Sequence, residues 1–75
     1  FNTTAIIKYQ IPKNSNISLK IYDLIGKEIE TLVNDYKTLG YYSVEFNAST
    51  LPSGVYFYKI QAGNYADVKK MLLIK

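Results

Sequence analysis

Apolar and polar residues alternate with a period of two along most of this chain. In the clearest segment, Ile17, Leu19 and Ile21 alternate with more polar neighbours. Such alternation is typical of a β-strand with one face in a core and the other in water. Groups of turn-forming residues, such as Pro12–Asn16 and Gly63-Asn64, interrupt the pattern at intervals of a strand's length. The pattern therefore predicts antiparallel strands joined by turns.

The alternation predicts six strands between about Thr3 and Ile74, or seven if one of them is divided. A helix competes only in the segment Ile25–Asp35, where the β-branched Thr31 and Val33 and the flanking glycines favour a hairpin. Three further apolar series follow period two: Ala5, Ile7, Tyr9 and Ile11; Ile29, Thr31 and Val33; and Tyr42, Val44 and Phe46. The prediction is an all-β protein without a helix.

In the stretch Leu51–Ile60, bulky residues occupy both the odd and the even positions of one predicted strand, so both of its faces carry bulk. In immunoglobulin-like and fibronectin-type-III sandwiches, a tyrosine near a strand start bonds back to the upstream backbone, and Tyr56 has nearly this spacing. With Tyr56 inward, Val55 and Phe57 face outward and need cover from a neighbouring segment or a partner. The fold prediction is a small immunoglobulin/fibronectin-III-like antiparallel β-sandwich. The residues assigned a structural role are Gly26, Leu51, Pro52, Gly54, Tyr56 and Tyr58.

Glycines mark two of the predicted turns. Gly26 follows the second strand at a place where a positive φ is needed, and glycine adopts it at low cost. Gly63-Asn64 separates two strands, and glycine at the first position of a two-residue loop favours a type II′ hairpin.

The alternation fails in the C-terminal segment Lys69–Lys75. An apolar series predicted to point inward consists of Ala66, Val68, Leu72 and Ile74. Lys70 interrupts this series, which suggests a bulge there. Met71 and Leu73 are then predicted to point outward. Two interpretations remain open on physical grounds: a strand covered on both sides by a neighbouring loop, or a recognition strand whose apolar side binds a partner.

Composition narrows the range of functions. The chain has 75 residues, enough for one small domain, and contains neither cysteine nor histidine. Ser-His and Cys-His nucleophiles are therefore excluded, and the carboxylates lack the spacing of a calcium site, so no catalytic residue, cofactor or metal is predicted. The net charge of +3 comes from scattered lysines without arginine, which argues against nucleic-acid binding. No apolar run is long enough for a membrane span.

Several motifs, taken together, resemble the type A C-terminal sorting domain of cargo proteins of the type IX secretion system of Bacteroidetes. The resemblance covers essentially the whole chain, which is expected to be a single domain, 1–75, cut from a longer cargo protein. The motifs are Phe1-Asn-Thr-Thr4, Ile17-Ser-Leu-Lys-Ile-Tyr-Asp23 with Gly26, Leu51-Pro-Ser-Gly-Val-Tyr-Phe-Tyr58, and Lys69-Lys-Met-Leu-Leu-Ile-Lys75.

The resemblance implies a non-catalytic address that directs an upstream cargo across the outer membrane. It implies that an outer-membrane translocon and a shuttle protein recognise the domain, and that a sortase usually removes it. The cargo would pass through the periplasm and reach the cell surface or the medium. The implied recognition residues are Lys69, Lys70, Met71, Leu72, Leu73, Ile74 and Lys75. Two alternatives remain: an immunoglobulin-like accessory or adhesion module, and a self-assembling structural subunit.

Overall fold

The computed structural model describes residues 2–75, so Phe1 of the first motif lies outside the described residues. These residues form strands and turns without a helix, which confirms the all-β prediction. The six strands are β1 (Thr4–Ile11), β2 (Ser15–Tyr22), β3 (Glu28–Lys37), β4 (Gly40–Asn47), β5 (Gly54–Ala62) and β6 (Tyr65–Leu73).

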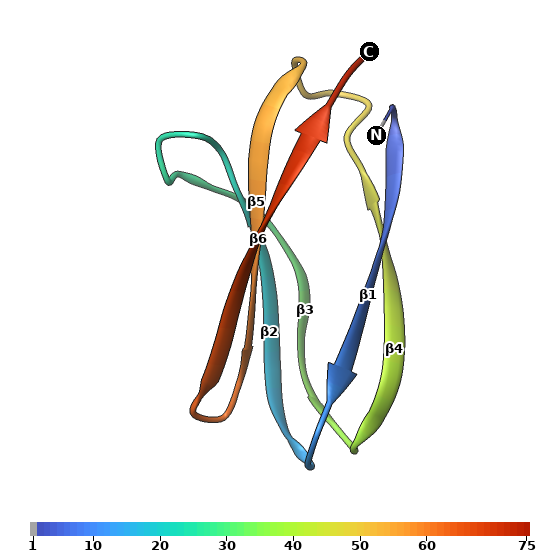
Figure 1. Cartoon of the computed structure of the whole chain (residues 1–75), viewed down its shortest axis with the longest axis vertical. Coiled ribbons are helices and arrows are strands. Elements are labelled where there is room, and N and C mark those ends of the chain that lie inside the picture. The colour runs from blue at the N-terminus through green and yellow to red at the C-terminus, as the bar shows by residue number, and fades with distance from the viewer. Residues whose placement is uncertain (1) are drawn as a thin grey trace.

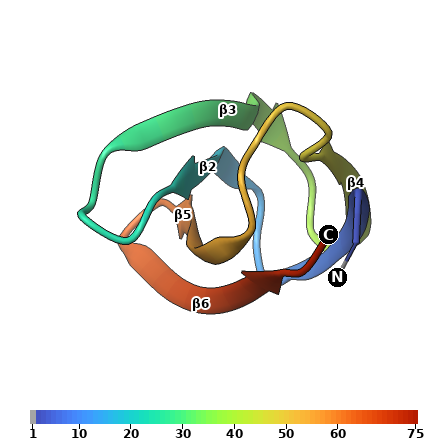
Figure 2. The same ribbon diagram turned by 90° about the horizontal axis from the view of Figure 1, so that it is seen from above.

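The strands form two antiparallel sheets that face each other (Figure 1). One sheet contains β1 and β4, and the other has four strands in the order β3-β2-β5-β6. Figure 2 shows that β3 and β6, the edges of the larger sheet, curve toward β4 and β1. The result is a small sandwich in which a two-stranded sheet covers the concave side of a four-stranded one.

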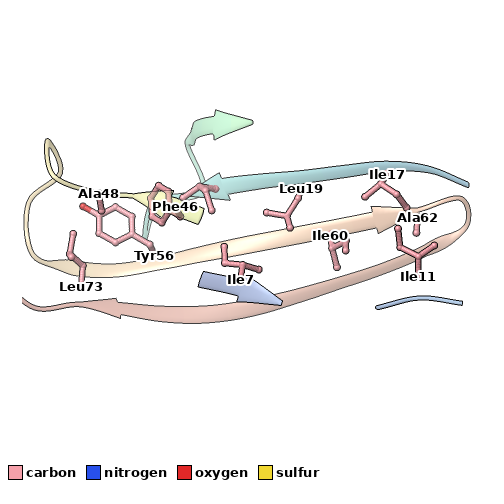
Figure 3. Close-up of a cluster of buried hydrophobic side chains, with 11 residues drawn as sticks. Ile7, Ile11, Ile17, Leu19, Phe46, Ala48, Tyr56, Ile60, Ala62 and Leu73 are labelled. Atoms are coloured by element: carbon pink, nitrogen blue, oxygen red, sulfur yellow. The ribbon is translucent and has the colours of Figure 1, made fainter. Parts of the chain in front are cut away.

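The core lies between the sheets and is drawn in Figure 3. Strand β2 contributes Ile17, Leu19 and Ile21, each at most 1% exposed, which agrees with the predicted alternation. Phe46 of β4 is 0% exposed and is among the largest fully buried side chains. The other buried hydrophobic residues are Ile7, Ile11, Ala48, Tyr56, Ile60, Ala62 and Leu73. No charged or polar residue among those described is buried.

Tyr56 makes the backbone contact that its spacing indicates. Its ring is 5% exposed, and its hydroxyl donates a 2.7 Å hydrogen bond to the carbonyl oxygen of Pro52. Leu51 and Tyr58 pack against the same core. The bond ties the start of β5 to the connection between the two sheets, as a tyrosine corner does.

The predicted turn glycines also adopt the expected backbone. Gly26 has φ +88° and Gly63 has φ +59°, whereas no non-glycine residue among those described has a positive φ. A positive φ at Gly63 alone is the pattern of a type II′ turn, and it joins β5 to β6 with Ala62 opposite Tyr65.

Strand β3 departs from simple alternation. Its pairing with β2 shifts register between Leu19 and Lys20 and again between Ile21 and Tyr22. Each shift changes which β3 side chains face the core. Thr31 is consequently exposed, while Leu32 and Val33 both pack against the core. Ile29, Thr31 and Val33 therefore do not share one face as predicted. The periodicity of the sequence did not reveal the register shifts.

Candidate recognition surface

The structure reverses the predicted orientation of the C-terminal strand. Leu73 is 1% exposed and belongs to the core, and Met71 packs against that core. Leu72 is 52% exposed and Val68 is 55% exposed, so the series that was predicted to be inward faces solvent. Ile74, after the strand, is 61% exposed. The prediction that Met71 and Leu73 point outward is therefore wrong.

Pairing with β5 explains the reversal. Residues directly opposite each other in an antiparallel pair lie on the same face of the sheet. Met71 lies opposite the inward Tyr56, and Leu72 lies opposite the outward Val55. The pairing is regular from Tyr65 to Leu73, so the bulge predicted at Lys70 does not occur. The short Gly63-Asn64 turn fixes this register, and it was the sequence signal that could have given the correct orientation.

Apart from the exposed Ile74, the predicted recognition residues are thus divided among three environments. Lys70 and Leu72 lie on the outer side of the sheet, whereas Met71 and Leu73 lie on the inner side. Exposed Lys69 also has inward parity, and its ammonium lies 4.0 Å from the carboxylate of Asp67.

Lys75 occupies the third environment, at the connection between β4 and β5. Its backbone N–H donates to Ser53 Oγ in this connection, residues 48–53 (3.1 Å), and its ammonium donates to the carbonyl oxygen of Ser49 (2.8 Å). The end of the described chain is therefore held against the sandwich.

The outer face of the four-stranded sheet gathers apolar and basic side chains from three strands. Tyr22, Phe57 and Lys70 lie opposite one another across β2, β5 and β6. The next row consists of Lys20, Lys59 and Val68. Val55 and Leu72 form a shorter row beside them. We refer to these eight residues as the outer face.

The turn Asp23–Lys27 provides part of the cover that Val55 and Phe57 need. The Asp23 carboxylate accepts hydrogen bonds from the backbone N–H groups of Ile25 (3.1 Å) and Lys27 (2.9 Å). These bonds hold a loop that projects away from the sheet between β2 and β3 (Figure 1). Val55 and Phe57 are half-buried, while Leu24 and Ile25 in the turn remain 68% and 88% exposed.

Two cavities flank this turn. One, of about 340 Å³, is lined by Leu24, Gly26, Tyr22, Phe57, Lys59 and Val68 together with Asp23. The other, of about 320 Å³, lies beside Leu24, Ile25 and Val55. Both are shallow hollows at the surface, and each is large enough for one side chain of a partner. The outer face therefore combines apolar surface with places where a side chain can enter.

The outer face carries three lysines, while Asp23 lines the hollow beside it and Glu28 pairs with one of the lysines. Lys20 forms an ion pair with Glu28, with Nζ 3.1 Å from Oε1, and the hydrogen bond to Glu28 raises the pKa of Lys20 above its ordinary value. Within residues 2–75, neither Lys59 nor Lys70 lies within ion-pair distance of a carboxylate. The surface is therefore suited to binding an anionic group beside an apolar one.

Residues 2–75 contain no group of three or more acidic, histidine or cysteine side chains placed to hold a metal ion. They also contain no helix that is long and apolar enough to cross a membrane. Sequence reasoning missed the outer face because three strands and a turn build it. The exposed Leu24-Ile25 pair was the local signal for the turn's contribution.

Comparison with known families identifies the chain. Neither the curated proteins nor the solved structures that were compared gave a match. The family model described as the secretion system C-terminal sorting domain matches residues 2–75, and the type IX motifs at Asp23, Tyr56 and the C-terminus lie within this range. Because the match spans nearly the whole chain, the protein belongs to the family of type IX secretion C-terminal sorting domains, whose role is to target proteins for export.

Proposed function

We propose that this domain is a non-catalytic address that carries an upstream cargo through the type IX secretion system. In this proposal the cargo passes through the periplasm, an outer-membrane translocon and a shuttle protein engage the domain, and a sortase removes it. The cargo then remains at the cell surface or enters the medium. The observation that carries the proposal is the family match over residues 2–75.

Within the domain, we assign recognition to the C-terminal segment Lys69–Lys75, with the orientation that the structure gives it. Leu72 and Ile74 present more than half of their surface to solvent, and Lys70 accompanies Leu72 on the outer face. Met71 and Leu73 instead hold the strand in the sandwich. In this proposal a partner contacts Lys70, Leu72 and Ile74. Burial of Met71 and Leu73 holds the strand so that Lys70 and Leu72 face outward.

A reporter experiment tests this function. A reporter with a signal for the periplasm is fused in front of residues 1–75 and expressed in a host that has the secretion system. We expect delivery of the reporter to the cell surface or the medium, measured by fractionation and by protease accessibility in intact cells. Retention of the fusion in the periplasm, with the domain folded, would contradict the sorting role.

Matched variants test the recognition segment. Leu72→Lys with Ile74→Lys adds charge at exposed positions and is expected to preserve folding while reducing export roughly tenfold, because losing the apolar contacts of two half-exposed side chains removes about 1.4 kcal/mol from binding. Ile6→Lys with Tyr41→Lys, at positions 56% and 83% exposed on the outer side of the other sheet, is the control for two added charges. Equal export of the two variants would show that the segment is not recognised.

A further inference from the structure

The outer face places two positive charges directly opposite each other. Lys20 of β2 and Lys59 of β5 are register partners, and like charges in this position of an antiparallel pair repel. Glu28 neutralises Lys20, but within the described chain no carboxylate lies within ion-pair distance of Lys59. Lys70, one row away on β6, likewise lacks an acidic partner there. Lys59 and Lys70 are therefore the two lysines of this face that can pair with carboxylates of a partner.

Apolar surface lies immediately beside these charges. Phe57 is half-buried, Val68 is 55% exposed, and both line the cavity of about 340 Å³ under the turn that carries Leu24. Lys59 lines the same cavity, so its charge and the apolar hollow are parts of one surface. A ligand that matches this surface has an apolar side chain next to carboxylates.

We propose that the outer face is a docking site for an acidic segment of a partner protein. One apolar side chain of that segment enters the cavity between Phe57, Val68 and Leu24, and neighbouring carboxylates pair with Lys59 and Lys70. This inference rests on the proposed function, since it names the partner chemistry of the sorting domain and adds a surface beyond the C-terminal segment.

A protein segment fits this surface better than an anionic lipid bilayer does. The exposed Leu24 and Ile25 would suit insertion into a bilayer, but Leu24 lines both hollows and Ile25 lines one of them. A bilayer surface meets the tip of the turn and leaves those hollows unfilled, whereas individual side chains of a polypeptide fill them. Desolvating apolar surface in this way is what gives an interface its affinity.

Binding of a defined acidic peptide to the purified 75-residue chain tests the proposal. The probe is the blocked peptide Glu-Leu-Glu-Phe-Glu, and its uncharged counterpart is Gln-Leu-Gln-Phe-Gln. Amide chemical shifts are followed by NMR during titration. We expect the acidic peptide to shift the amide resonances of Phe57, Lys59 and Val68. The uncharged peptide should bind with an affinity at least about fivefold lower, because it cannot form the ion pairs.

Two pairs of variants separate charge from apolar contact. Lys59→Glu is compared with Lys8→Glu, which makes the same charge change on the exposed side of β1, opposite Ser43. Val68→Ser is compared with Ile6→Ser, since these side chains are 55% and 56% exposed. We expect only the outer-face variants to weaken peptide binding, each roughly fivefold or more.

Three results would overturn the docking proposal. The first is peptide shifts centred on β1 and β4, and the second is equal weakening by Lys59→Glu and Lys8→Glu. The third is Lys59-dependent binding to phosphatidylglycerol vesicles without binding to the acidic peptide, which would assign the face to a membrane surface.

The reporter fusion separates this inference from the sorting role. Both proposals are supported if the wild-type fusion is exported, Lys59→Glu reduces this export and Lys8→Glu does not. Export that is unchanged by Lys59→Glu overturns the docking proposal and leaves the sorting role intact. If the wild-type fusion is not exported, the sorting role fails, and the peptide titration still decides whether the outer face binds acidic segments.

Discussion

Single side chains connect parts of this sandwich that the backbone ladders do not join. Tyr56 fills the core at the start of β5 and bonds through its hydroxyl to Pro52 in the connection between the sheets. At the end of the chain, Lys75 donates to Ser49 and Ser53 of the same connection. Asp23 accepts two backbone hydrogen bonds and thereby shapes the turn beside the outer face. These contacts position the proposed functional surfaces.

Removal of the Tyr56 hydroxyl tests how much this single side-chain hydrogen bond contributes to stability. Tyr56→Phe keeps the ring in the core and removes the hydrogen bond to Pro52, so we expect the free energy of unfolding to fall by about 1 kcal/mol. Urea denaturation followed by circular dichroism measures the change. Tyr41→Phe is the control, because Tyr41 is 83% exposed and its replacement should leave stability unchanged. Equal effects of the two variants would show that the corner bond does not contribute.

At the scale of elements, the β5–β6 hairpin decides which side of the C-terminal strand a partner can reach. A two-residue turn with glycine at φ +59° leaves one register, and that register turns Leu73 inward and Leu72 outward. Both are leucines on neighbouring positions of one strand, so their different burial comes from pairing alone. The orientation of the proposed recognition segment is therefore a property of the hairpin.

Adjacent lysine substitutions test this orientation. Leu73→Lys places a charge without a partner in the core, which costs several kcal/mol, and we expect the domain to unfold. Leu72→Lys, with 52% of the native side chain exposed, should remain folded with nearly unchanged stability. Far-ultraviolet circular dichroism and urea titration distinguish the two variants. A folded Leu73→Lys protein beside an unfolded Leu72→Lys protein would contradict the register.

At the scale of the whole molecule, a two-stranded sheet closes the core of a four-stranded one. The smaller sheet contributes buried Ile7, Ile11 and Phe46, and Phe46 of β4 is the largest of these side chains. A domain of this size has a small total stability, on the order of 0.05–0.15 kcal/mol per residue. Loss of a single central side chain therefore removes a large share of it.

Phe46→Ala tests the contribution of this closure. Deleting a buried phenylalanine ring costs about 3–5 kcal/mol, so we expect the variant to be largely unfolded or to melt far below the wild type. Differential scanning calorimetry measures the change. Ile6→Ala, on the exposed side of the same sheet, serves as the control and should shift the melting temperature little. A small effect at Phe46 would indicate that the smaller sheet contributes little to stability.

The sequence by itself determined the fold class, the turns at Gly26 and Gly63, the inward positions of β2 and the Tyr56 corner. These features depend on local periodicity and on backbone conformations that particular residues favour. Only the tertiary structure decided the faces of β3 and assembled the outer face, whereas the faces of β6 follow from its pairing with β5 through the Gly63-Asn64 turn. The reason is physical. A bulge moves side chains from one face of a strand to the other. In a strand with apolar residues at both odd and even positions, pairing with the neighbouring strand decides which set faces the core. By their apolar character alone, either Val68 and Leu72 or Leu73 could face the core. Pairing with β5 places Leu73 there.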